Sequence, residues 1–100
     1  MTLTYRVTEY GPEEPDRWTD PECYRDIVAD SVRDAAVRYC ERVDPAWSIE
    51  RRRGDQLLVR RLTVYVRTPD SEVWEVPIVA GVASWTYRDD DRRPMRRRRA

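Results

Sequence analysis

The sequence predicts an α+β domain in which one long helix packs on an antiparallel sheet of four to five strands, in the order strand, helix, strand, strand, strand. Three observations predict this class. Residues 2–9 alternate apolar and polar side chains, residues 20–43 carry an apolar stripe with helical spacing, and residues 47–80 return to alternation between turn residues. An antiparallel sheet wrapped across one helix lets both elements bury their apolar faces.

The length of the chain, 100 residues, suits a single small hydrophobic core. We expect residues 1–88 to form this domain. Residues 89–100 hold charged blocks and little apolar surface, so we expect an arginine-rich tail that is disordered or ordered only by a partner. No apolar run approaches the ~20 residues that span a bilayer, and the N-terminus lacks the order of a signal peptide. We therefore expect a cytoplasmic protein without a membrane partner.

The long helix is predicted to begin after Asp20, a residue type that caps helix N-termini, with Pro21 in its first turn. Asp44 and Pro45 are expected to end it. Its stripe of apolar or small residues consists of Tyr24, Ile27, Val28, Ser31, Val32, Ala35, Ala36, Tyr39, Cys40 and Val43. Steps of three and four residues put all of these on one face.

The second half of the chain contains two predicted hairpins. Residues 47–50 alternate and lead into a tight turn at Gly54-Asp55, after which residues 57–67 and 73–80 form the second hairpin. A five-residue loop, residues 68–72, places three apolar pairs on one face, whereas a four-residue loop mixes the faces. These pairs are Val66 with Trp74, Val64 with Val76, and Leu62 with Ile78. Because Pro77 has no N–H, we expect it at an edge or a bulge.

The resulting layout is similar to that of cystatin-like folds. The likeness is one of layout alone, because no residue motif of that family is present.

Several chemical functions are disfavoured by composition. Histidine is absent, which removes the most common general base and metal ligand. Cys23 and Cys40 both fall on the predicted helix, ~26 Å apart, too far for a disulfide. Two cysteines without histidine do not make a zinc site. We therefore expect a protein that is not an enzyme and that uses no metal or cofactor.

Charge is distributed unevenly along the chain. Residues 1–50 hold 6 arginines and 12 acids, a net charge of −6, and residues 51–100 hold 13 arginines and 7 acids, a net charge of +6. Every basic residue is arginine, and lysine, asparagine and phenylalanine are absent. Because the codons of the missing residues are AT-rich, we expect the source to be a GC-rich bacterium, or a phage or other mobile element that lives in one.

Two arginine groups are the candidate partner-binding residues. The first surrounds the predicted hairpin tip and consists of Arg51, Arg52, Arg53, Arg60 and Arg61. The second lies in the tail and includes Arg96, Arg97, Arg98 and Arg99. Three acceptors are open for the tail: the acidic stretch Glu13 to Asp20 of the same chain, the same stretch of a second subunit, or a phosphate backbone.

The sequence thus favours a small non-enzymatic accessory protein that binds a host protein or assembles with itself. The alternative is a nucleic-acid-binding module that uses both arginine groups. A continuous basic face that joins the two groups favours nucleic acid, whereas isolated basic points favour a protein partner.

Overall fold

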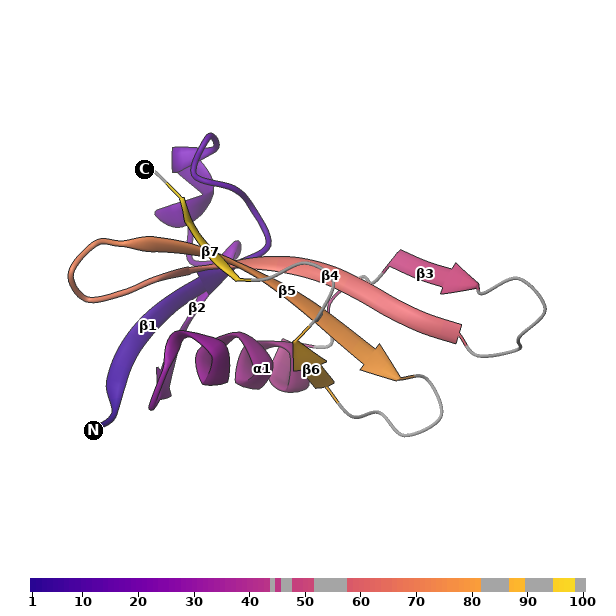
Figure 1. The fold of residues 1–100 in the computed structure, drawn as a ribbon. Helices are drawn as coiled ribbons and strands as arrows, with labels where there is room; N and C mark the ends of the chain where they lie inside the picture. Colours follow the sequence, from indigo (N-terminus) through magenta and orange to yellow (C-terminus); the bar gives the residue numbers. More distant parts are fainter. Residues whose placement is uncertain (44, 46–47, 52–57, 82–86, 90–94, 99–100) are drawn as a thin grey trace.

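The structure is a computed structural model, and it describes residues 1–43, 45, 48–51, 58–81, 87–89 and 95–98. These residues form one α-helix, one 3-10 turn and seven strands (Figure 1). The elements are β1 (Leu3–Thr8), η1 (Pro15–Trp18), β2 (Tyr24–Ala29), α1 (Val32–Val43), β3 (Ser48–Arg51), β4 (Leu58–Arg67), β5 (Val73–Gly81), β6 (Tyr87–Asp89) and β7 (Arg96–Arg98).

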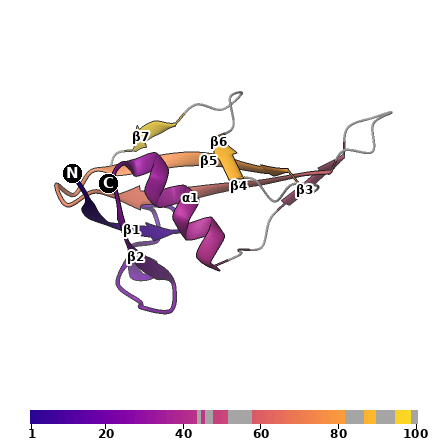
Figure 2. The same ribbon diagram turned by 90° about the horizontal axis from the view of Figure 1, so that it is seen from below.

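All strand pairs are antiparallel, and the main path of the sheet is β2-β1-β4-β5-β6. Off this path, β3 pairs with β4, and β7 pairs with β5. The predicted fold class, one helix on an antiparallel sheet, is confirmed. Helix α1 covers one face of the sheet, while η1 lies on the opposite face, which we call the outer face (Figures 1 and 2).

The predicted register of the second hairpin is confirmed. β4 and β5 pair Val66 with Trp74, Val64 with Val76, and Leu62 with Ile78. The loop spans residues 68–72 and is closed by a hydrogen bond of 2.8 Å from Thr68 N to Glu72 O. The four residues of this register that lie deepest in the core are fully buried beneath α1, namely Val64, Val66, Val76 and Ile78.

The helix begins later than the sequence predicts. It starts at Val32, with Ser31 as its N-cap, because Ser31 Oγ accepts a hydrogen bond of 3.0 Å from Asp34 N. Asp20 caps no helix: its carboxylate accepts from Glu22 N at 3.0 Å within a turn. From Val32 onward the predicted stripe is confirmed, with Ala35, Ala36, Tyr39 and Cys40 buried.

The segment Tyr24–Ala29, predicted as the first part of the helix, is strand β2. It pairs with β1 in a register that sets Ile27 opposite Tyr5. Ile27 and Ala29 are buried, whereas Val28 between them is 57% exposed. This burial has a period of two, and the pairing with β1 satisfies the backbone as well as a helix would.

Two short strands share the edge of β5 that faces away from β4. β6 pairs Asp89 with Ile78, and β7 pairs Arg96 with Glu75. From Asp89 to Arg96 the chain is seven residues long, whereas their partners on β5, Ile78 and Glu75, are three residues apart. The connection between β6 and β7 is therefore four residues longer than uninterrupted pairing with β5 would need. Pro77, which is buried, lies in this gap. Its missing N–H is consistent with the interruption and with the expected edge position.

Candidate functional site

The described arginines of the predicted tip group lie on paired strands. Arg51 ends β3 opposite Leu58, and the same ladder pairs Arg60 with Ile49 and Arg61 with Ser48. The predicted pairing of these two strands is therefore confirmed, and the predicted turn at Gly54-Asp55 lies outside the described residues. Arg52 and Arg53 lie outside the described residues.

In the described contacts, the tail arginines pair with none of the three acceptors that the sequence leaves open. Arg96–Arg98 form strand β7 on the edge of β5 of the same chain, so the expectation of a tail that is disordered or ordered only by a partner is wrong for these residues. Arg99 lies outside the described part of the chain. The tail and tip groups are separate: Arg96 pairs with Glu75 and Arg61 with Val79, four residues (79 − 75), or ~13 Å, along β5.

We call the contacts between β7 and two glutamates the arginine clasp. Arg96 Nε and Arg98 Nη1 each donate to Glu75 Oε2 at 3.0 Å. Arg97 Nη1 donates to Glu72 Oε1 at 3.5 Å. The Glu75 side chain is only 19% exposed, so this carboxylate is a partly desolvated anchor for two guanidinium groups.

Register explains how the clasp is built. Arg96 and Arg98 lie two residues apart on a strand, so their side chains share the face that carries Glu75. Arg97 shares the opposite face with Trp74. Met95, just before β7, is half-buried and packs against the hydrophobic core, which adds an apolar anchor to the ionic ones.

The charges of the clasp alter the acidity of its neighbours. Burial alone would raise the pKa of Glu75, but the hydrogen bonds from Arg96 and Arg98 outweigh burial and lower that pKa. Burial raises the pKa of the Tyr65 hydroxyl, and the nearby carboxylates of Glu75 and Glu13 raise it further. Glu75 is therefore ionised, and Tyr65 protonated, at neutral pH.

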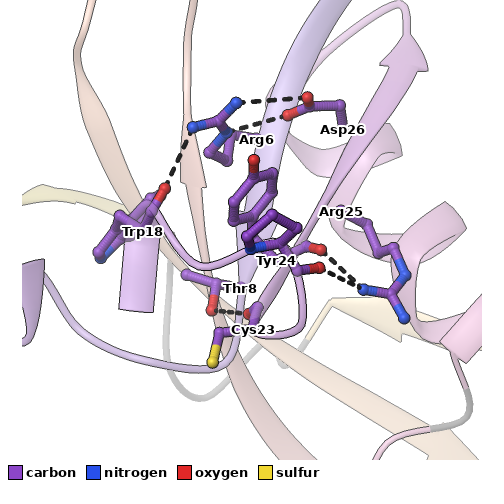
Figure 3. A network of polar contacts seen from close by, with 8 residues as sticks. Arg6, Thr8, Trp18, Cys23, Tyr24, Arg25 and Asp26 are labelled. Carbon is purple, nitrogen blue, oxygen red and sulfur yellow. Dashed lines mark hydrogen bonds and ion pairs between the residues drawn. The ribbon is translucent and has the colours of Figure 1, made fainter. Parts of the chain in front are cut away.

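A second polar network ties the 9–23 connection to the outer face (Figure 3). Arg6 Nε donates to Asp26 Oδ1 at 3.0 Å, its Nη1 donates to Trp18 O at 3.1 Å, and its guanidinium lies 3.9 Å from the Tyr24 ring centroid. Buried Thr8 donates from Oγ1 to Cys23 O at 2.6 Å. These contacts hold the loop of residues 9–23 against β1 and β2.

The same network continues toward the clasp. Arg67, next to Arg6 in the ladder, lies 4.8 Å from the Trp18 ring centroid. Val73, opposite Arg67 on β5, is buried and pairs with Arg98. The clasp therefore lies beside a packed surface to which Trp18 of loop 9–23 contributes.

Both cysteines are free thiols, but the predicted reason for their separation is wrong, because Cys23 precedes β2 and is not part of a helix. Half-buried Cys23 accepts a hydrogen bond of 3.6 Å from Arg17 and donates one of 3.5 Å to Asp20. Cys40 is buried in the core, and burial raises the pKa of its thiol to about 12. Cys40 is thus an inert core residue.

Within the described ranges, no three side chains of metal-ligating type gather in one place. The single described helix is neither long nor apolar enough to cross a membrane. Comparison of the chain with protein-family models, curated proteins and solved structures finds no match. Among the described residues, the arginine clasp on β5 is the candidate functional site.

Proposed function

We propose that this protein is a non-enzymatic interaction module that binds an extended, arginine-containing segment of a protein chain by strand addition at β5. One observation carries the proposal: the edge of β5 already holds such a segment, β7, between Glu72 and Glu75. The arginines of β7 therefore indicate which side chains this edge of β5 binds.

In strand addition, backbone contacts give affinity and side-chain contacts give specificity. Pairing with Val73–Glu75 supplies backbone hydrogen bonds that are independent of sequence. The shared carboxylate of Glu75 selects arginines at alternate positions, because only side chains two residues apart reach the same face. The place of Met95 adds a preference for an apolar residue just before the first arginine.

The alternative, nucleic-acid binding by the arginine groups, has weaker support. Three tail arginines already pair with Glu75 and Glu72, and the negative charges of these carboxylates oppose the approach of a phosphate backbone.

A full-length variant with an open edge tests the proposal. In R96E/R98E the tail is repelled by Glu75, so the edge of β5 becomes free for a peptide in trans. A labelled peptide of residues 94–100, Pro-Met-Arg-Arg-Arg-Arg-Ala, should bind this variant in a fluorescence anisotropy titration and should bind more weakly at high salt.

Two controls make the result specific. The same peptide carrying R96Q/R98Q should bind about fivefold more weakly, which corresponds to about 1 kcal/mol for the two ion pairs, and so should the native peptide when the protein also carries E75Q. Equal binding in either control contradicts the proposed site. Tight binding of a duplex oligonucleotide by the wild type, with no peptide binding to the variant, supports the nucleic-acid alternative.

A further inference from the structure

We infer that the segment which binds this edge is the arginine strand of a second copy, exchanged reciprocally so that two chains form a symmetric dimer. This inference rests on the proposed function and names its partner. The recognised pattern is an apolar residue followed by arginines at alternate positions, and each copy carries it at Met95, Arg96 and Arg98.

Chain length permits the exchange. Between Asp89 of β6 and Arg96 of β7, seven residue steps span at most ~25 Å when extended. Closure within one chain needs only the ~10 Å between Ile78 and Glu75 on β5. The four surplus residues let β7 leave its own edge and reach that of a neighbour while β6 keeps its pairing with β5.

The contacts of β7 favour an exchangeable strand. Among the described residues of the tail, three pair with β5, and the side chains of Arg96 and Arg97 are each 65% exposed. Releasing β7 therefore breaks few contacts, and seating it on a second copy restores all of them. In a reciprocal exchange, each Glu75 again receives two arginines, so neither chain keeps an unpaired carboxylate.

Charge also favours pairing of like chains. Strand β7 carries Arg96, Arg97 and Arg98, and the edge of β5 that they contact carries Glu72 and Glu75. Two copies related by a twofold axis place the basic tail of each against an edge of the other that carries Glu72 and Glu75.

A charge-swap experiment on full-length chains tests the inference. One chain carries R96E/R98E, and the other carries E72R/E75R. Each has a like-charged tail and edge, so neither should dimerise alone. Mixed one to one, they should form a heterodimer in native mass spectrometry, because each tail then meets an edge of opposite charge. A chain with all four substitutions should behave as the wild type does.

A second test of the exchanged dimer uses the wild-type chain alone. Sedimentation should show the wild type dimerising as its concentration approaches ~1 mM, the effective concentration typical of a short tether. Excess free peptide of residues 94–100 should return it to monomer. A wild type that remains monomeric at this concentration overturns the inference, and so does a mixture of the folded charge-swap variants without heterodimer.

The two proposals fail separately. If the labelled peptide binds the open-edge variant but no dimer forms, the edge binds an arginine segment and the exchange is refuted. If the peptide does not bind either, strand addition at β5 is refuted as well.

Discussion

Neutralising Glu75 tests the strength of the arginine clasp. Its carboxylate accepts from Arg96 and Arg98 at 3.0 Å each, and the two arginine side chains are 65% and 35% exposed. Ion pairs of this exposure contribute about 0.2–1 kcal/mol each. Glu75→Gln should therefore lower the free energy of unfolding by about 1 kcal/mol, which for a domain of this size lowers Tm by about 4–8 °C.

Glu72→Gln is the matched control. Glu72 is 43% exposed and makes one longer contact, 3.5 Å, to Arg97, so its loss should cost less than about 0.5 kcal/mol. Thermal unfolding followed by circular dichroism at low and high salt measures both variants. The deficit of Glu75→Gln should shrink at high salt. The role given to Glu75 is refuted if the stability lost in Glu75→Gln does not depend on salt, or if it is no larger than the stability lost in Glu72→Gln.

The same variant predicts a pH dependence. The clasp lowers the pKa of Glu75 in the folded protein, so its stabilising contribution is complete above the ordinary carboxyl range, about 4.3. This contribution is lost as the pH falls through the lowered pKa of the folded state. Wild type and Glu75→Gln should therefore differ in Tm at pH 7 and converge as the pH falls through the lowered pKa of Glu75.

Three further predictions concern the fold. Thr8→Val should cost about 1–3 kcal/mol in urea unfolding, because the carbonyl of Cys23 loses its donor in a buried site, whereas Thr8→Ser should retain most of the stability. Ser31→Ala should cost about 1 kcal/mol as a lost N-cap, and no comparable cost should follow from Asp20→Ala if α1 begins at Val32. A thiol-specific reagent should label the native protein once, at Cys23, as mass spectrometry of wild type and Cys23→Ser will report, since Cys40 is buried and its pKa is raised to about 12.

The hairpin of β4 and β5 was predictable because its constraint is local. A five-residue loop and a period of two leave one register that puts Val64, Val66, Val76 and Ile78 on one face. A shift of one residue would bury polar side chains, so pattern and loop length together determine the answer.

The start of α1 was not predictable from periodicity alone. Ile27 fits both a helical stripe and an alternating strand, and short apolar runs carry this ambiguity. Tertiary pairing decides between helix and strand here. The edge of β1 that faces away from β4 pairs with Tyr24–Ala29, which makes this segment a strand. Two signals pointed to the later start: the cap pattern from Ser31 to Asp34, and the β-branched pair Ile27-Val28.

The candidate site was recognisable only in part. The sequence drew attention to the tail arginines, yet among the described contacts their acceptors are Glu72 and Glu75 rather than the more acidic stretch from Glu13 to Asp20. A count of charges along the sequence points to the most acidic stretch as the acceptor of the tail arginines. In a sheet, however, the strand register decides which carboxylates lie next to them. Glu75 was not conspicuous in sequence because its importance arises from the face it shares with Arg96 and Arg98.

The central claim is that the arginine strand pairs with β5 in one antiparallel register, and nuclear Overhauser contacts in the wild-type protein test it most directly. The account predicts backbone contacts between Arg98 and Val73, between Arg97 and Trp74, and between Arg96 and Glu75, within one chain or across an exchanged pair. Backbone contacts of Arg96–Arg98 with any other strand, or tail resonances with random-coil shifts and no contact to β5, would contradict it.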